Sequence, residues 1–168
     1  VTRRGSRLSS GFAASFFDYD SVAGHDRASE FEFLAQRPRS DWAKILDRCE
    51  TRRFSAGELL VSAGEQDRAL YLLTEGTVGV RLHADAERTF TAIDAPSVLG
   101  EVAFLDGGPR SATLFAITDG ELLRLRLESF EVLSARDPEL GRAILFDLAK
   151  IVTARLRLAN DAIARAGG

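Results

Sequence analysis

The feature that most constrains the fold of this chain is a run of short apolar segments, each ended by a turn-forming residue. The run extends over residues 52–127, and its turn signals recur roughly every 8–12 residues. It has no segment long enough for the crossover helices that join parallel strands. Frequent turns between short strands are typical of an antiparallel barrel or a double-sheet roll. The predicted strands are residues 59–61, 69–73, 77–82, 90–93, 112–116 and 121–125.

After this run the pattern becomes helical. Residues 128–135 predict a short helix, and Asp137-Pro138 predicts a break and a new helix, with the aspartate as its cap. Apolar residues then recur every three or four positions, which predicts one long amphipathic helix over residues 138–164. Its predicted apolar face consists of Leu145, Leu148, Val152, Leu156, Ala159 and Ile163.

The N-terminal part divides into an extension and a short helix. Residues 1–40 are expected to be an extension that is partly flexible, and its aromatic residues are expected to pack on the body or on another copy. Ser40 is predicted to cap a short helix whose apolar residues recur at helical spacing: Trp42, Ile45, Leu46 and Cys49. Together the patterns predict an α+β fold. In it, an antiparallel β-roll (a double-stranded jelly roll) is flanked by an N-terminal helix and C-terminal helices.

Composition excludes several function classes. Apolar residues make up 45% of the 168 residues and charged residues 28%, which is ordinary for a globular domain. A net charge of −3 gives no electrostatic reason to expect nucleic acid or a membrane surface as a partner. No apolar run approaches the roughly 18 residues of a membrane span. The chain has no methionine, even at position 1, so we expect a fragment of a longer protein or an alternative start.

The cysteine and histidine content argues against disulfides and metal sites. Cys49 is the single cysteine, so no internal disulfide can form, which fits a cytoplasmic location. His25 and His83 are far apart in the sequence and have no cysteine or carboxylate at ligand spacing. We therefore expect no metal. A cupin-type metalloenzyme, which needs two or three histidines and a carboxylate close together, is disfavoured on the same ground.

The chemistry is concentrated in residues 99–113. Gly100 permits close approach of a ligand, and the helical turn predicted after it would present free N–H groups to an anion. Arg110 offers a planar cation to phosphate oxygens, and Ser111 adds a hydroxyl. Glu101 would repel phosphate but would accept hydrogen bonds from sugar hydroxyls. This combination predicts a nucleotide that carries little negative charge.

The order Gly-Glu, a short apolar turn and then Pro-Arg-Ser-Ala-Thr at 109–113 resembles the phosphate-binding cassette of cyclic-nucleotide-binding domains. That family includes the bacterial catabolite activator protein, the regulatory subunits of protein kinase A and cyclic-nucleotide-gated channels. The turns at 54–58 and 63–65 and the strand at 69–73 resemble the family as well. The resemblance covers about residues 41–165. It implies a domain over 41–166, with the roll at 52–127 and hinge and lid helices at 128–166.

The resemblance also implies roles for individual residues. Gly100 and Glu101 would hold the ribose 2′-hydroxyl, and Arg110 would neutralise the cyclic phosphate. Ser111 stands where cGMP binders often carry threonine, which favours cAMP over cGMP. Thr153 and Arg155 on the final helix are candidate base contacts. The expected ligand-binding residues are Gly100, Glu101, Val102, Arg110, Ser111 and Ala112.

The function that follows is that of a sensor rather than an enzyme: a cyclic nucleotide binds and the final helix moves over it. Phe104 and Leu105 are expected to relay the change to Phe130. The alternative is a degenerate roll that binds no nucleotide and serves as a structural or interaction module. A pocket blocked by a side chain from the final helix would favour that alternative. No recognition helix follows the long helix, so DNA is not an expected partner of this chain. A homodimer through the long helix is expected, and the regulated effector is not readable.

Overall fold

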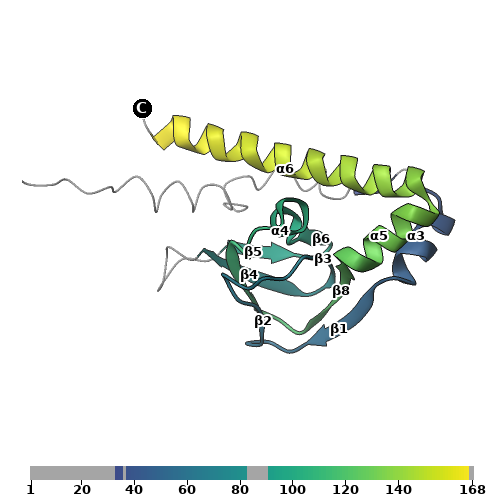
Figure 1. Cartoon of the computed structure of the whole chain (residues 1–168). Helices are drawn as coiled ribbons and strands as arrows, with labels where there is room; N and C mark the ends of the chain where they lie inside the picture. Colours follow the sequence, from purple (N-terminus) through teal and green to yellow (C-terminus); the bar gives the residue numbers. More distant parts are fainter. Residues whose placement is uncertain (1–32, 36, 83–90, 167–168) are drawn as a thin grey trace, which may run out of the picture.

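The structure, a computed structural model, describes residues 33–35, 37–82 and 91–166. Eight strands form a roll, with one helix before them, one short helix inserted among them and two helices after them (Figure 1). The strands are β1 (Glu50–Phe54), β2 (Leu59–Val61), β3 (Ala69–Glu75), β4 (Thr77–Leu82), β5 (Thr91–Asp94), β6 (Ser97–Leu99), β7 (Ala112–Ala116) and β8 (Gly120–Arg126). The helices are α3 (Arg39–Leu46), α4 (Glu101–Asp106), α5 (Leu127–Arg136) and α6 (Pro138–Ala166).

The strands form two four-stranded sheets, in the orders β1-β8-β3-β6 and β2-β7-β4-β5, and every pairing is antiparallel. This confirms the predicted α+β fold, an antiparallel β-roll with an N-terminal helix and C-terminal helices. The predicted list of strands lacks β1 and β6. The sequence pattern does not reveal β1, because four of its five residues are not buried and it has no apolar run. β1 pairs with β8 from Glu50 opposite Arg124 to Phe54 opposite Gly120.

Two apolar cores lie on opposite faces of β3. Successive side chains of a strand point to opposite faces of its sheet. Ala69, Tyr71 and Leu73 therefore enter the core inside the roll, while Leu70 and Leu72 enter the core under the helices. A strand that is buried on both faces reads as a continuous apolar run, as β3 does. Phe33 and Leu34, which precede α3, belong to the core under the helices.

The first helix begins two residues earlier than predicted. α3 starts at Arg39 with Pro38 in the cap position, and no side chain caps it, so the prediction that Ser40 is the cap is wrong. The fixed φ of proline suits a helix start, and it makes a side-chain cap dispensable. Of the apolar residues at helical spacing, Ile45 is buried, and Trp42 packs at the edge of the core beside Phe33.

The buried face of α6 also differs from the predicted one. Leu145 and Leu156, which belong to the predicted apolar face, are 41% and 46% exposed. Among the predicted residues, Leu148 and Ala159 are buried, and Ile163 has a side chain outside the described residues. The face that packs inward consists of Leu140, Ile144, Leu148, Ile151, Arg155 and Ala159. The pattern is misleading because this stripe contains a charged residue, Arg155, while a second apolar stripe lies on the outer side.

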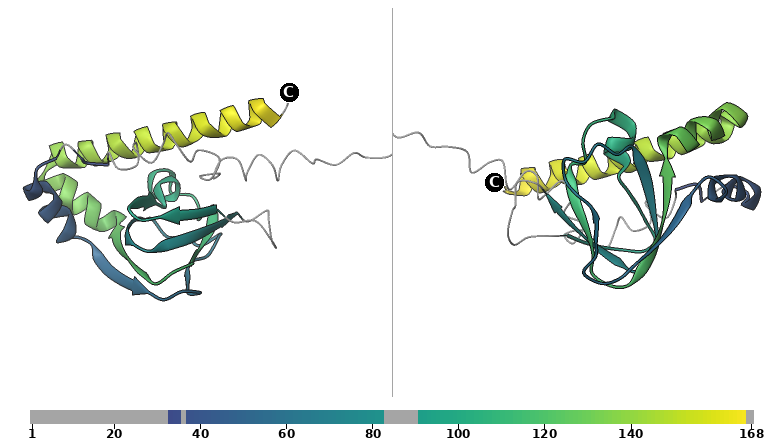
Figure 2. Two further views of the ribbon diagram at one scale, coloured as in Figure 1. Left: turned by 180° about the vertical axis from the view of Figure 1, so that it is seen from behind. Right: turned by 60° about the horizontal axis from the view of Figure 1, so that its bottom comes forward.

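The position of α6 defines where a ligand could reach the roll. α6 extends across the open end of the roll, and α4 lies between it and the strands (Figures 1 and 2). α4 packs against both β3 and α6. Among the described helices, none is long and apolar enough to span a lipid bilayer.

Candidate functional site

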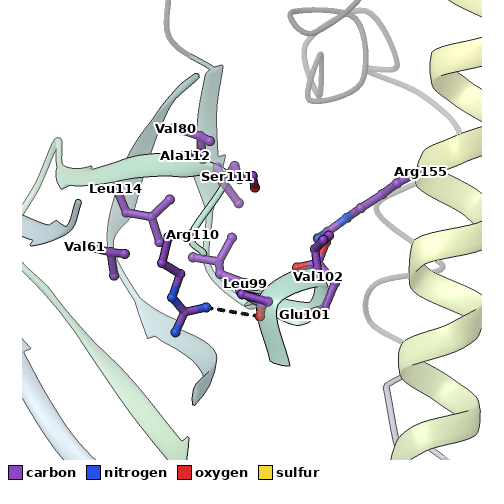
Figure 3. A pocket seen from close by; sticks show the side chains of 13 residues that line it. Val61, Val80, Leu99, Glu101, Val102, Arg110, Ser111, Ala112, Leu114 and Arg155 are labelled. Atoms are coloured by element: carbon purple, nitrogen blue, oxygen red, sulfur yellow. Dashed lines mark hydrogen bonds and ion pairs between the residues drawn. The ribbon is translucent and has the colours of Figure 1, made fainter. Parts of the chain in front are cut away.

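A small cavity lies at the end of the roll that α6 covers (Figure 3). Its volume is about 40 Å³. The lining brings together every ligand-binding residue predicted from the sequence, and it adds Arg155 from α6. The lining residues are Val61, Val80, Ile93, Leu99, Gly100, Glu101, Val102, Ala103, Arg110, Ser111, Ala112, Leu114 and Arg155. The site is therefore an apolar recess in the roll with polar groups at its entrance.

Gly100 shapes the entrance. Its φ is +78°, in the left-handed region that disfavours side chains, and it leads directly into α4. A Cβ atom at this position would collide with the guanidinium of Arg110 and would lie 3.0 Å from the carbonyl oxygen of Ala69. Glycine is thus required both for the backbone conformation and for the approach of Arg110. The glycine also places Glu101 at the first position of α4, where its side chain is 3% exposed.

Arg110 is buried and held from three sides. Its Nη1 donates to the Gly100 carbonyl oxygen at 3.1 Å, and its Nη2 donates to the Ala69 carbonyl oxygen at 2.7 Å. The same Nη2 forms an ion pair with Asp67 at 2.8 Å, and the guanidinium lies over the ring of Tyr71 at 4.9 Å from its centre. Its Nε is buried and has no hydrogen-bond partner among the described residues. A buried N–H without a hydrogen-bond partner costs free energy. The Nε–H of Arg110 can therefore donate a hydrogen bond to a ligand oxygen.

Asp67 joins Arg110 to a second arginine. Its carboxylate accepts hydrogen bonds from Arg110, from Arg124 on β8 at 2.7 Å and from the hydroxyl of Tyr71 at 2.7 Å. Burial acts to raise the pKa of Asp67, but the hydrogen bonds from these three donors outweigh it and lower the pKa to about 2. Arg124 also forms an ion pair with Glu50 at 3.7 Å, so each guanidinium of this cluster has a carboxylate partner.

The low pKa of Asp67 predicts how the stability of the fold changes in acid. A carboxyl group whose pKa is lowered by folding stabilises the protein above its unfolded pKa and loses this contribution as the pH falls. The contribution of Asp67 should thus be complete above pH 3.8 and should disappear as the pH falls to about 2. Urea unfolding of the wild type and Asp67→Asn at several pH values tests this. The two stabilities should converge within that window.

A second variant separates this effect from a general loss of structure. Tyr71→Phe removes one hydrogen bond to Asp67 and keeps the ring under Arg110, so the acid transition should move to higher pH. Stability curves for the wild type and Asp67→Asn that stay parallel down to pH 2 would show that the carboxylate is not held by this network.

Glu101 is paired with the long helix. The Nη1 of Arg155 forms an ion pair with Glu101 at 2.5 Å, and both side chains are 4% exposed. The Nη2 of Arg155 donates to the carbonyl oxygen of Val98 on β6 at 2.8 Å. Figure 3 shows Arg155 extending from α6 to Glu101 at the start of α4. The side chain therefore links α6, α4 and the roll.

The other candidate base contact is not at the cavity. Thr153 is exposed, and its hydroxyl donates to the carbonyl oxygen of Ala149 in its own helix. Two residues of a helix are separated by roughly 200° around its axis, so Thr153 and Arg155 face opposite sides. In this conformation only Arg155 of the two can reach a ligand in the cavity.

Of the two residues of α4 that were predicted to relay a change to Phe130 of α5, one contacts it. Phe104 is 1% exposed and packs edge-on against Phe130 of α5, with ring centres 5.4 Å apart. Leu105, the second expected relay, is 37% exposed and does not belong to either core. It follows Phe104 by one residue on α4, and neighbouring helix residues point in directions about 100° apart.

Sequence reasoning missed the groups that hold Arg110. Asp67 is 43 residues from Arg110 and 57 from Arg124, and no spacing rule connects them. The one available signal is that an arginine predicted to enter a roll needs a carboxylate nearby. Within the described part of the chain, no group of three histidine, cysteine or carboxylate side chains is placed to hold a metal ion. Residues His25, His83, Phe12, Phe16, Phe17 and Tyr19 lie outside the described residues.

Comparison with known proteins identifies the family of this chain. A family model described as "Cyclic nucleotide-binding domain" matches residues 51–137. The chain is 34% identical over 113 residues to the "Cyclic AMP receptor protein" of Thermus thermophilus, over 66% of this chain and 50% of that protein. It is also 32% identical over 145 residues to "Glutaminase 2" of Bradyrhizobium diazoefficiens, over 86% of this chain and 23% of that protein. The chain therefore spans half or less of these two relatives.

A solved structure shows the same architecture. The crystal structure of the Thermus thermophilus catabolite activator protein superposes with a TM-score of 0.70 at 28% identity. The match covers 80% of this chain and 62% of that one. It includes the roll, which confirms the fold independently of the sequence motifs.

Proposed function

The chain belongs to the cyclic nucleotide-binding domain family, and on that premise we propose that it is a sensor that binds a cyclic nucleotide at the cavity between α4, β7 and α6. The family is regulatory and in general not enzymatic. We propose the same for this chain: no catalysis of its own, and a cytoplasmic location that its lone cysteine supports. The relatives it matches include a receptor protein and a glutaminase, so the regulated effector is not specified by the resemblance.

The observation that carries this proposal is the unpartnered Nε of Arg110. The rest of the guanidinium is fixed by Gly100, Ala69 and Asp67, so the side chain is oriented before any ligand arrives. A fixed cation binds an anion without the entropy cost of ordering a long side chain. A phosphodiester carries one negative charge, which the guanidinium of Arg110, a lining residue of the cavity, would neutralise. Ser111 and the backbone N–H of Ala112 complete the proposed phosphate site, and Gly100, Glu101 and Val102 the proposed ribose site.

We propose cAMP as the preferred ligand over cGMP. The support is Ser111, which stands where the resemblance implies threonine for cGMP binders, and which lines the cavity. Apart from the three charged residues Glu101, Arg110 and Arg155, the rest of the lining is aliphatic or glycine, and it offers few groups to read a purine edge. The expected preference is therefore modest, about tenfold or less, which corresponds to roughly 1.4 kcal/mol.

Isothermal titration calorimetry with cAMP and cGMP tests the proposal. We expect saturable binding of at least one of them, and no binding of non-cyclic 5′-AMP at the same concentration, because its second phosphate charge has no partner in the site. No heat with either cyclic nucleotide at high micromolar concentration, in a protein that unfolds cooperatively, would remove this function.

One observation favours the second candidate, a roll that binds no nucleotide. Arg155 enters the cavity from the final helix and forms an ion pair with Glu101. The volume of the cavity beside this pair is about 40 Å³. A water molecule needs roughly 10–15 Å³, whereas small-molecule sites are typically about 300–1,000 Å³. In the conformation described, the cavity admits a few water molecules at most. A ligand can bind only if α6 moves.

We further propose that a second copy of the chain covers the outer stripe of α6. Leu145, Ala149, Val152 and Leu156 are spaced by four, three and four residues, the spacing of a coiled-coil seam, and Phe146 beside them is 64% exposed. Two copies of a helix with such a seam can pack their seams against each other. Sedimentation velocity should show a dimer that Leu156→Glu dissociates. A wild type that sediments as a monomer at 100 times the concentration of the calorimetry cell would contradict this.

A further inference from the structure

We propose that the turn at residues 62–65 is the positioning element of Arg110, and that Gly64 is the residue on which this turn depends. The turn would hold the main chain of Arg110 at the point from which its guanidinium can meet a phosphate. This inference rests on the proposed function, because it concerns how the binding site is held. None of the turn residues lines the cavity, so the turn would affect a ligand only through Arg110.

The first step is the contact between the turn and the main chain of Arg110. The Gly64 N–H donates to the Arg110 carbonyl oxygen at 2.8 Å, and the Arg110 N–H donates to the Glu65 carbonyl oxygen at 2.9 Å. Arg110 precedes β7, which begins at Ala112, so no pairing of the described strands includes it. The turn therefore partners both main-chain polar groups of an arginine that the sheets do not hold.

The second step is that the residues directly after the turn hold the guanidinium. Asp67 forms an ion pair with the Nη2 of Arg110 at 2.8 Å, and the Ala69 carbonyl oxygen accepts a hydrogen bond from the same nitrogen at 2.7 Å. One continuous segment, residues 64–69, thus contacts Arg110 at its main chain and at the tip of its side chain. A cation held at both ends keeps one orientation, and it loses less conformational entropy when a ligand binds. A change in the turn would remove one of these two attachments.

The third step is a second copy of the turn, because the sequence Ser-Ala-Gly-Glu occurs at 55–58 and again at 62–65. In both copies the glutamate N–H donates to the serine carbonyl oxygen, at 3.0 and 3.2 Å, and the glycine has a φ of +85° or +86°. Each is a β-turn whose third residue has a positive φ, which favours glycine. In the first copy the glycine N–H donates to the Ala116 carbonyl oxygen at 2.8 Å, and the Ala116 N–H donates to the glutamate carbonyl oxygen at 2.8 Å. The same turn thus holds the end of β7 in one copy and Arg110 in the other.

The experiment compares the full chain as wild type, Gly64→Ala, Gly64→Asn and the matched control Gly57→Ala. Both glycines are exposed, and apart from its chain neighbours a Cβ atom at either position would have no heavy atom within 4 Å. The two alanine variants therefore add no side-chain clash, and each disfavours its turn only through the positive φ. Asparagine adopts a positive φ more readily than alanine, so Gly64→Asn should largely restore the turn.

The first readout is hydrogen exchange of individual amides, followed by NMR without ligand. The Arg110 amide should exchange about tenfold faster in Gly64→Ala than in the wild type, and the Ala116 amide should do so in Gly57→Ala, each without the other. In Gly64→Asn the Arg110 amide should exchange within about threefold of the wild-type rate. Unchanged exchange of the Arg110 amide in Gly64→Ala, or equal acceleration of both amides, would overturn the assignment of this turn to Arg110.

The second readout is calorimetric titration with cAMP and with cGMP, beside urea unfolding of each variant. Both alanine variants should lower the urea midpoint equally, but only Gly64→Ala should raise the dissociation constant, by about tenfold, which corresponds to roughly 1.4 kcal/mol. Gly64→Asn should recover most of the affinity. An equal loss of affinity in Gly57→Ala, or none in Gly64→Ala, would overturn the positioning role. Binding of neither nucleotide by the wild type, together with selective exchange, would reject the proposed function but not the hold of the turn on Arg110.

Discussion

Replacing Arg110 with lysine is expected to weaken cyclic-nucleotide binding by about 100-fold. Lysine keeps the charge, but its one ammonium cannot contact Gly100, Ala69, Asp67 and a phosphate together. The ligand would lose the donor that the Nε offers and the fixed orientation that the three other contacts provide. Hydrogen bonds to charged groups contribute roughly 1.5–3 kcal/mol each, and 2.7 kcal/mol corresponds to about 100-fold in affinity. Calorimetric titration of both proteins measures the difference.

The same substitution should also lower stability, and this must be measured beside the affinity. Loss of the contacts to the Gly100 and Ala69 carbonyl oxygens leaves buried acceptors with fewer partners, at a cost of about 1–3 kcal/mol. Arg53→Lys is the matched control, since Arg53 is 88% exposed on β1 and is not among the lining residues. It should change neither property. A dissociation constant for Arg110→Lys within threefold of the wild type would show that phosphate does not bind at Arg110.

The residues of the cavity were predictable where chain continuity brings them together. Gly100, Glu101, Val102, Arg110, Ser111 and Ala112 belong to one strand-turn-strand segment, so their proximity follows from local structure. The partners of Arg110 were not predictable in this way. Asp67 precedes β3 and Arg124 lies within β8, and the pairing of these two strands brings them together beside Arg110. Local patterns thus identify the groups that meet a ligand, while tertiary pairing determines how these groups are held.

Apolar periodicity alone does not separate the two stripes of α6, although the family resemblance places Arg155 toward a ligand. Pattern reading assigns every charged residue of a helix to the solvent side, because isolated buried charges are unstable. Arg155 breaks this rule because Glu101, from another element, is its partner. Once Arg155 is placed inward, the residues at 144, 148, 151 and 159 follow at helical spacing. The apolar residues on the other side then form a separate stripe that packing within this chain does not explain.

Replacing a leucine by alanine should lower the stability strongly on the inner stripe of α6 and hardly at all on the outer one. Leu148 is fully buried in the core under the helices, so Leu148→Ala should lower the free energy of unfolding by about 3 kcal/mol, from lost transfer energy and a residual cavity. Urea unfolding monitored by circular dichroism measures this loss. Leu145→Ala removes the same atoms from a side chain that is 41% exposed, and it should change the stability of the monomer by no more than about 0.5 kcal/mol.

Protein concentration distinguishes what the outer stripe does. If a second copy covers it, the urea midpoint of the wild type rises with protein concentration, because association stabilises the folded state by mass action. Leu145→Ala should reduce this rise, whereas Leu148→Ala should lower the midpoint by the same amount at every concentration. Equal losses from the two substitutions in dilute protein would mean that Leu145 is buried within the single chain. The inward face of α6 would then be the one predicted from its apolar periodicity, and Arg155 would lose its place at the cavity.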